Sequence, residues 1–448
     1  MPVQKKANVT ELHTARHDSS EKARSGMDKI LVRGGSRLNG TIAVSGAKNA
    51  ALPLMCAAIL SDEPLQLRNM PLSLNDIKTL TAVLNELGVV SGTPEDHTLM
   101  LHAPAITCHK APYDLVRKMR ASVLVLGPLL ARTGQADVSL PGGCAIGTRP
   151  VDLHIDGLRA MGADISIEGG YIKASAPQGL KGAEINFPKV SVGATENLMM
   201  AATLAAGETI LSNAAREPEI VDLGECLIAM GAQIEGLGSP VIRIRGVEKL
   251  HAATHHVVPD RIETGTWMIA VCLTGGTLRL QKTRLEHLSA LIGPLKEAGL
   301  KIEHEGDDVI VSRNGRPLRG TDIMTEPYPG FPTDLQAQFM TMLTLCVGAG
   351  MVTETIFENR FMHVPELNRM GADIRVQGNS AIIRGVPDLV GAEVMATDLR
   401  ASASLILAAL VAQGETTINR IYHLDRGYEN IVEKLQSCGA DIERVANI

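Results

Sequence analysis

The sequence is poor in four features that mark other classes of protein. Its longest apolar runs reach roughly a dozen residues where a membrane-spanning helix needs about 20, so we exclude a membrane-spanning chain. The seven cysteines stand singly, without CxxC pairs, which favours a reducing cytoplasm over a disulfide or zinc framework. The net charge is −6 and no basic run is interleaved with aromatic residues, so we expect no nucleic-acid partner. Aromatic residues make up only 2% of the chain, and the core must therefore be built from aliphatic side chains and methionine.

The length of 448 residues corresponds to two or three domains at about 150 residues each. Residues 1–26 are polar and lack the apolar stretch of a secretory signal. We predict that they form a disordered tail and that the folded part begins at Met27.

One phrase recurs along the chain: a helix, a glycine, and then a short strand, as in RAMGADISI and NRMGADIRV. The glycines of the six copies are Gly88, Gly162, Gly231, Gly299, Gly371 and Gly439. Successive copies are 68 to 74 residues apart, which indicates six copies of one structural unit. Each copy has an apolar helix such as ATENLMMAATLAAG, a strand, an amphipathic helix, two strands and a further extended piece. The sequence therefore predicts an α/β fold of six β-α-β-α-β-β repeats.

The sixth copy stops at Ile448, soon after its glycine, so its closing strands are expected to come from elsewhere in the chain. Residues 29–44 have the form of those strands. We therefore predict a discontinuous domain of residues 27–47 plus 259–448, and an inserted domain of residues 48–258, with three repeats in each. Two linkers, near Ala47 and Pro259, would let a hinge close the cleft between the domains.

The first helix of each unit begins at a short polar turn, and helix N-termini attract anions. These turns span residues 45–49, 117–122, 191–195, 260–264, 333–336 and 397–400. If the units of a domain are related by pseudosymmetry, the turns bring Lys48, Arg120 and Arg400 beside Asp334. For any one of them, a helix cap or a solvated charge is the commoner role. The Ser-Gly-Ala sequence before Lys48 permits close approach of a ligand, so we interpret Lys48 as a phosphate- or carboxylate-binding residue.

The segment SLPGGCAIGTRPVDLH, residues 139–154, is the most unusual in the chain. Its glycines indicate a mobile loop that carries Cys144 and Arg149. A thiol in such a loop near an arginine is reactive if its pKa is lowered, and inert otherwise. Arg426 stands between an expected strand and an expected helix, which by itself is weak evidence for a role. His154, His363 and His423 lack the spacing of metal ligands, so we assign no metal.

Nine motifs now point to one family. They are SGAKNAALP, APYDLVRKMRAS, LPGGCAIGTRPVDLH, NAAREPEIVD, PDRIETGT, FPTDLQAQF, FENRFMHVPEL, ATDLRASASL and IYHLDRGYE. Over residues 27–448 the chain resembles the UDP-N-acetylglucosamine 1-carboxyvinyltransferases, members of the enolpyruvyl transferase family. The resemblance implies two inside-out α/β barrels of three repeats each, with the active site in the cleft between them. It implies transfer of the enolpyruvyl group of phosphoenolpyruvate to the 3-hydroxyl of UDP-N-acetylglucosamine with release of phosphate, in the bacterial cytoplasm, without metal or organic cofactor. This is the first committed step of peptidoglycan precursor synthesis, and therefore of cell-wall biogenesis.

The resemblance also implies roles for single residues, and the chemistry explains their types. Lys48, Arg149 and Arg426 would face the phosphate of phosphoenolpyruvate, and Arg360 and Arg400 its carboxylate, because guanidinium groups bind carboxylates in a bidentate way. Cys144 would be the acid and Asp334 the base. The epoxide fosfomycin is expected to inactivate the protein by attachment to Cys144.

The sugar nucleotide would lie along a larger set of residues, several of them acting through backbone groups. These are Asn49, Arg120, Arg149, Pro150, Val151, Asp152, Leu153, Lys189, Val190, Ser191, Val192, Gly193, Asp334 and Ile356. Loop 141–149 would close over this substrate and exclude water.

Three alternatives stay open. A 3-phosphoshikimate 1-carboxyvinyltransferase shares the fold and the donor but uses another acceptor; the PGGC loop and FPTDLQAQF favour the sugar nucleotide. A catalytically silent paralogue would bind the sugar nucleotide or a protein partner without turnover. A purely structural six-repeat scaffold gives no reason for cations at matching helix starts.

Overall fold

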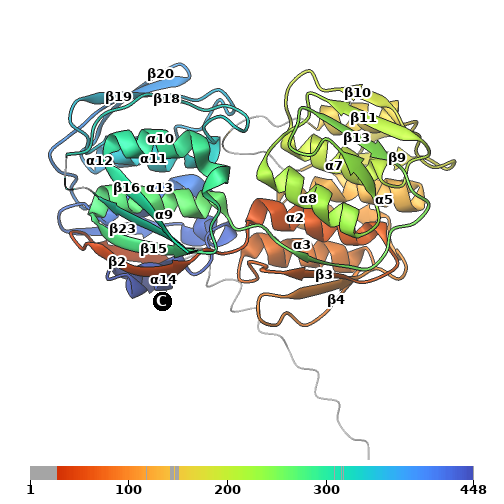
Figure 1. The fold of residues 1–448 in the computed structure, drawn as a ribbon, viewed down its shortest axis with the longest axis horizontal. Coiled ribbons are helices and arrows are strands. Elements are labelled where there is room, and N and C mark those ends of the chain that lie inside the picture. Colours follow the sequence, from red (N-terminus) through yellow and green to blue (C-terminus); the bar gives the residue numbers. More distant parts are fainter. Residues whose placement is uncertain are drawn as a thin grey trace, which may run out of the picture.

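The computed structural model describes residues 28–117, 119–141, 146, 151–306, 308–313, 315 and 317–446. These residues form six four-stranded sheets, distributed over two lobes (Figure 1). In every sheet one pair of strands, at an edge of the sheet, is parallel and the other two pairs are antiparallel. The six predicted repeats are thus confirmed by one topology that recurs six times.

Three sheets belong to one lobe and three to the other. The first lobe has β14(Ala253–His256)-β3(Leu65–Arg68)-β5(Leu99–His102)-β4(Val90–Ser91), β6(Lys110–Ala111)-β7(Gln135–Ser139)-β9(Tyr171–Ser175)-β8(Asp164–Glu168), and β10(Glu184–Asn186)-β11(Glu208–Ser212)-β13(Val241–Arg245)-β12(Gln233–Glu235). The second has β16(Leu300–Glu305)-β17(Asp308–Arg313)-β15(Gly276–Gln281)-β2(Leu38–Ala43), β18(Ile323–Met324)-β19(Ala349–Thr353)-β21(Ser380–Arg384)-β20(Asp373–Gln377), and β22(Glu393–Met395)-β23(Glu415–Asn419)-β1(Lys29–Arg33)-β24(Asp441–Val445).

The helices fall into a buried set and an amphipathic set. The first helices of the units are α2(Lys48–Ala57), α5(Leu126–Thr133), α7(Val192–Ala202), α9(Arg261–Thr274), α11(Gln336–Leu343) and α13(Leu399–Ala409). The second are α3(Asn75–Glu86), α6(Asp152–Ala160), α8(Pro218–Ala229), α10(Ser289–Ala298), α12(Val364–Arg369) and α14(Ile431–Ser437), and short helices are α4(Tyr113–Val116), η1(Ala58–Leu60), η2(Arg120–Val125), η3(Leu285–Leu288), η4(Thr333–Leu335) and η5(Ile421–Arg426). Nearly every residue of the first set is buried, as expected of helices that are apolar all round. The sheets alternate buried and exposed residues, as β13 does, so the helices lie inside and the sheets outside.

Two hydrophobic clusters form the cores, one for each lobe. The first is built from residues between Ala47 and Val258, and the second from Ile30 to Ile42 together with Ile262 to Ile442. Aliphatic side chains and methionine fill both, and the single tryptophan, Trp267, lies in the second.

The N-terminal strands are used differently from the prediction. β1 pairs with β23 and β24 and completes the sixth sheet, as expected. The expectation that both closing strands come from residues 29–44 is wrong, because β24 supplies one of them and β2 instead pairs in parallel with β15. The chain leaves the second lobe after β2 and returns to it after β14. As a result β2 pairs with β15, the strand that follows α9, and β14 pairs with β3, the strand that follows α2. In the order of the units, β2 is thus the opening strand of the fourth and β14 that of the first.

The chain therefore crosses between the lobes twice, after β2 and after β14, and the two linkers run side by side. The Ala47 N–H donates to the Val258 carbonyl at 2.8 Å, and the Asp260 N–H donates to the Ser45 carbonyl at 2.9 Å. We propose that the domain boundaries lie in these paired linkers, where the sequence predicts them.

A close contact between helices α5 and α7 gives a first prediction. The Gly127 N–H donates to Asn197 Oδ1 at 2.6 Å, and a Cβ on Gly127 would stand 2.1 Å from that oxygen and 2.5 Å from the Asn197 carbonyl oxygen. We expect Gly127→Ala to destabilise the fold by about 3 kcal/mol, because both helices are fixed by the surrounding core. Thermal unfolding measures this, with Gly193→Ala on α7 as control, since its Cβ would meet only the His154 ring at 3.4 Å. Equal melting temperatures for the two variants would contradict the packing account.

Candidate active site

Asp334, in η4, lies at the centre of a cluster drawn from four segments. Its Oδ1 accepts from Arg360 Nη2 at 2.7 Å and its Oδ2 from Arg400 Nη2 at 2.7 Å. Asn49 Nδ2, from the other lobe, donates to the same Oδ2 at 3.4 Å. Burial alone would raise the pKa of Asp334, but Arg400 and Arg360 together hold it well below its usual range. The carboxyl is therefore an anion held by two arginines.

A second cluster surrounds Asp76, in the first turn of α3. Asp76 accepts from Arg426 Nε at 2.9 Å and from Lys48 Nζ at 3.4 Å. The Asp76–Arg426 ion pair also joins the two lobes. Burial lowers the pKa of Lys48, Asp76 opposes this, and Arg400 and Arg426 add to it. The pKa of Lys48 therefore depends on charged side chains of both clusters.

Both guanidinium groups that hold Asp334 keep a further buried donor. Among the described residues, Arg360 Nε and Arg400 Nη1 have no hydrogen-bond partner, although each side chain is only 4% exposed. A buried N–H of a charged group without a partner is costly. An anion placed against these donors would satisfy both.

Helix starts bring the charged side chains to the clusters, as the repeat pattern predicts for Lys48, Arg400 and Asp334. α2 begins at Lys48, directly after the first linker. α13 begins after Asp398, whose carboxylate accepts from the Arg400 N–H at 2.8 Å and the Ala401 N–H at 3.1 Å. This cap fixes the first turn of α13 and with it the base of the Arg400 side chain.

Glu354 organises the segments around Asp334. It accepts from the hydroxyls of Thr325 and Thr333, each at 2.8 Å, and from the Ile356 N–H at 2.8 Å. Thr333 in turn accepts from Arg360 Nη1 at 2.9 Å. Glu354 and Asp76 could not be recognised as site residues from the sequence. An acidic residue at the end of a strand or the start of a helix is common, and nothing in the neighbouring residues indicates which distant side chains it contacts.

Several of the predicted nucleotide residues lie on α7 or on helices that pack against it, whereas Asp334 and Ile356 lie in the other lobe. Ser191 caps this helix by accepting from the Ala194 N–H, and Gly193 lies near the ring of His154, which Asn197 holds by a contact of 2.9 Å. Burial, and then Arg120, lower the pKa of His154 to about 4. Lys189 and Val190 precede α7, and Val192 is its first residue. Val151 precedes α6, and Asp152 and Leu153 lie in the first turn of α6. Arg120 is the first residue of η2, and Ile356 follows Glu354 by two positions. Both η2 and α7 pack against α2, whose first turn carries Lys48 and Asn49.

Three predicted residues, Cys144, Arg149 and Pro150, lie outside the described residues. Between them Ile146 is described, and it is buried. Its carbonyl accepts from the Asn359 N–H at 3.0 Å. This point of the 141–149 segment therefore touches the turn of the other lobe that carries Arg360.

The histidines considered above are neutral. Burial is the largest cause that lowers the pKa of His363 and of His423, in each case to about 4. Within the described ranges no group of three or more His, Cys, Asp or Glu side chains is arranged to hold a metal ion, and no helix is both long and apolar enough to cross a membrane.

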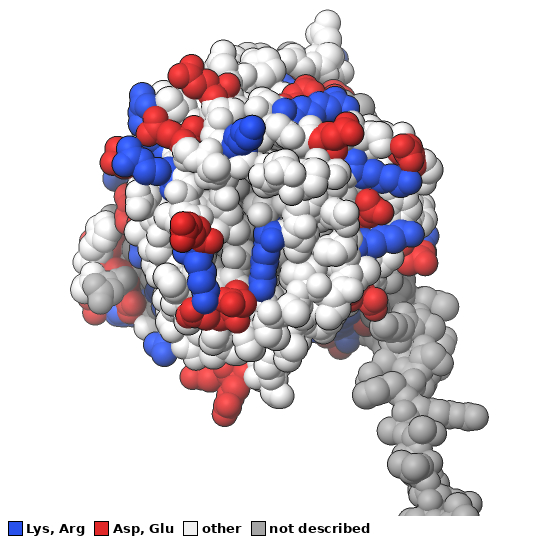
Figure 2. All heavy atoms as spheres, turned by 90° about the vertical axis from the view of Figure 1, so that its right-hand side faces the viewer, with Lys and Arg blue, Asp and Glu red and all other residues white. Residues whose placement is uncertain are grey.

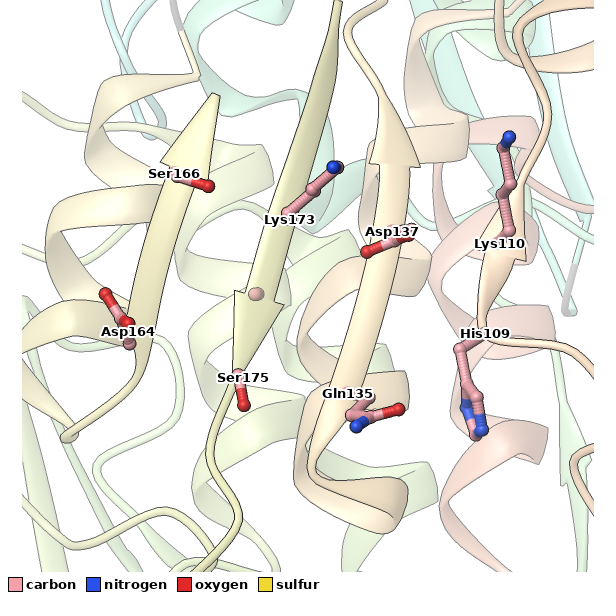
Figure 3. A pocket seen from close by; sticks show the side chains of 9 residues that line it. His109, Lys110, Gln135, Asp137, Asp164, Ser166, Lys173 and Ser175 are labelled. Atoms are coloured by element: carbon pink, nitrogen blue, oxygen red, sulfur yellow. The ribbon is translucent and has the colours of Figure 1, made fainter. Parts of the chain in front are cut away.

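The outer surface of the first lobe carries charged side chains of both signs. A hollow of about 410 Å³ lies on the outer face of β6-β7-β9-β8, where His109, Lys110, Asp137 and Lys173 project from neighbouring strands (Figure 3). On the face at the right-hand side of Figure 1, acidic and basic side chains are interspersed over the visible surface (Figure 2). Neither surface gathers cations as the clusters around Asp334 and Asp76 do.

Comparison with known proteins decides the family. A family model described as EPSP synthase (3-phosphoshikimate 1-carboxyvinyltransferase) matches residues 32–435. The chain belongs to this enolpyruvyl transferase family. It is 62% identical over 429 residues to a UDP-N-acetylglucosamine 1-carboxyvinyltransferase of Rhodospirillum centenum, covering 94% of this chain and 99% of the relative. It is 61% identical to a protein of the same name from Granulibacter bethesdensis, covering 94% of this chain and 100% of the relative.

Solved structures of enolpyruvyl transferases confirm the predicted fold class. The enolpyruvyl transferase NikO from Streptomyces tendae has a TM-score of 0.85 at 26% identity and covers 94% of this chain and 100% of its own. An EPSP synthase from Acinetobacter baumannii has a TM-score of 0.71 at 19% identity, covers 93% of this chain and 100% of its own, and supports the fold alone.

Proposed function

We propose that this enolpyruvyl transferase moves the enolpyruvyl group of phosphoenolpyruvate to the 3-hydroxyl of UDP-N-acetylglucosamine, with release of phosphate, in the bacterial cytoplasm. The observation that carries the acceptor is the full-length identity of 61–62% to relatives named for it. The observation that supports the donor is the set of cations gathered where the lobes meet, of which Arg360 and Arg400 are each only 4% exposed.

The donor has two anionic ends, and the two clusters offer one set of cations for each. Lys48 and Arg426, joined by Arg149, would bind the phosphate. Arg360 and Arg400 would bind the carboxylate through their buried donors Nε and Nη1. Fixed cations hold such a multiply charged anion without reorganisation.

In the addition step, the sugar O3 attacks C2 of phosphoenolpyruvate while C3 takes a proton from the Cys144 thiol. The proton of the 3-hydroxyl goes to Asp334. In the elimination step the bond from C2 to the phosphate oxygen breaks, a proton from C3 returns to the Cys144 thiolate, and the double bond between C2 and C3 forms again. The released phosphate would take the proton held by Asp334, which restores both residues. Asp334 is a weak base while two arginines hold it; the substrate carboxylate would draw both away and raise its pKa.

The acceptor would lie against Arg120 and the N-terminal amides of α7, an 11-residue helix that begins after Ser191. Helix N-termini bind phosphate groups, which suits the diphosphate. The loop 141–149 would close over it and bring Cys144 and Arg149 to the reacting centre. The contact of Ile146 with Asn359 supports such a position.

The buried Lys48 gives a pH prediction. Because burial lowers its pKa, kcat/KM for phosphoenolpyruvate should fall with rising pH before an ordinary lysine loses its proton, since the neutral amine no longer binds phosphate. In Lys48→Arg this descending limb should move to higher pH, because a guanidinium stays charged. A limb that does not move in this variant would show that another group titrates and would contradict the assignment.

The experiment that tests the proposed function measures phosphate release from phosphoenolpyruvate with each acceptor separately. Release with UDP-N-acetylglucosamine alone is expected. Release only with shikimate 3-phosphate would keep the family and overturn the acceptor, and no release with either, despite binding of the sugar nucleotide, would indicate a silent paralogue.

A further inference from the structure

A chain of hydrogen bonds runs through the second core, directly behind the cleft. Three polar side chains form it: Thr266 on α9, Gln338 on α11, and Tyr428, which follows η5. They are 1%, 0% and 4% exposed. Buried polar groups in an otherwise apolar core seldom add stability over apolar side chains of the same shape, so this chain needs another explanation.

The direction of each hydrogen bond can be worked out from the donors. Thr266 Oγ1 donates to the Ile262 carbonyl at 2.8 Å, so its only proton is used within its own helix. The Tyr428 hydroxyl, 2.9 Å away, must therefore donate to Thr266. Gln338 Nε2 donates to the Tyr428 hydroxyl at 2.9 Å and the Asp334 carbonyl at 3.0 Å, and it also lies 3.3 Å from Thr266 Oγ1. Donation therefore runs from Gln338 both ways: through Tyr428 and Thr266 to α9, and back to the Asp334 backbone.

The same tyrosine touches the other side of the site. The guanidinium carbon of Arg400 lies 5.4 Å from the centre of the Tyr428 ring, within the range of a cation–π contact. Burial is the largest cause that raises the pKa of Tyr428, and Arg400 opposes it, so the hydroxyl keeps the proton that the chain requires. Tyr428 also stands two residues after Arg426. One side chain therefore connects Asp334, Arg400 and the segment that holds Arg426.

We propose that Tyr428, Gln338 and Thr266 are positioning residues that fix the Asp334 backbone and the Arg400 guanidinium relative to Arg426, and so set the affinity for phosphoenolpyruvate. This rests on the proposed function of the cleft. None of the three side chains needs to touch substrate for this role.

The test compares Tyr428→Phe with a matched control, Ser404→Ala. Tyr428→Phe keeps the ring beside Arg400 but removes the donor to Thr266. Ser404→Ala removes a buried hydroxyl from α13, the helix of Arg400, but within the described ranges this hydroxyl bonds only to the Ala401 carbonyl of its own helix. We expect KM for phosphoenolpyruvate to rise by up to about tenfold in Tyr428→Phe, the effect of losing one buried hydrogen bond between neutral groups. The dissociation constant of UDP-N-acetylglucosamine should stay within about twofold in both variants, as should KM in Ser404→Ala.

A second pair keeps the test decisive if Tyr428→Phe fails to fold. Thr266→Val removes the acceptor of the Tyr428 proton and should reproduce the rise in KM. Thr266→Ser retains the hydroxyl, so its KM should equal that of the unaltered protein. The proposal is overturned if KM is unchanged in Tyr428→Phe and Thr266→Val, or if Ser404→Ala raises it equally. If the unaltered protein releases no phosphate, the proposed function is refuted but the positioning role is not. Calorimetry would then compare the binding of phosphoenolpyruvate to the same variants.

Discussion

Asp334→Asn is expected to have the largest effect of any single substitution in the cleft. The variant cannot take the proton of the sugar hydroxyl, and it leaves two buried guanidinium groups without their anion. We expect phosphate release to fall by about 10²- to 10⁴-fold, the usual contribution of a general base. We also expect a loss of about 2 to 3 kcal/mol of stability, below the value for a fully buried pair because the Asp334 side chain is 24% exposed.

The electrostatic part of this effect has its own readout. Added phosphoenolpyruvate or inorganic phosphate should raise the melting temperature of Asp334→Asn more than that of the unaltered protein, because the anion replaces the lost charge beside Arg360 and Arg400. Asp373→Asn is the control: Asp373 forms an exposed ion pair with Arg384 at 3.7 Å, which contributes little. Phosphate release at the original rate in Asp334→Asn would disprove the role of Asp334 as base.

Substitution of Cys144 should separate catalysis from inhibition. The thiolate sulfur of Cys144 is expected to open the epoxide of fosfomycin, with a new S–C bond formed and a C–O bond broken. Cys144→Asp retains an acidic proton, so it should transfer the enolpyruvyl group but resist fosfomycin, whereas Cys144→Ala should lose about 10²-fold or more in phosphate release.

The control for this experiment is Cys108→Ala. Among the described cysteines, Cys108 is the one that is not buried, and its removal should leave both phosphate release and fosfomycin sensitivity unchanged. Mass spectrometry of the inactivated protein should find one adduct, on the peptide that carries Cys144. Inactivation that proceeds equally well in Cys144→Asp would refute the assignment.

The architecture could be predicted because it repeats. A glycine after each second helix, six times at nearly constant spacing, specified six equivalent sheets. The partner of β2 could not be predicted, since a short strand of alternating pattern fits either the end of one unit or the start of another. Only the parallel pairing with β15 distinguishes them.

The site was predictable to the extent that single residues stand in recognisable motifs. Lys48, Asp334, Arg360, Arg400 and Arg426 could each be named, but not the carboxylate that holds Lys48 and Arg426 in the structure. This is Asp76, a residue of an ordinary amphipathic helix whose partners are 28 and 350 positions away. The Tyr428 chain was missed for the same reason, because its three members look like any polar residues in helical sequence.

The central claim, that this cleft joins phosphoenolpyruvate to the 3-hydroxyl of UDP-N-acetylglucosamine, is tested most directly by following carbon-labelled phosphoenolpyruvate by NMR. The account predicts that the label appears as an enol ether on O3 of the sugar nucleotide, with one phosphate released for each ether formed. Label that ends in free pyruvate, or that is transferred only to shikimate 3-phosphate, would contradict it.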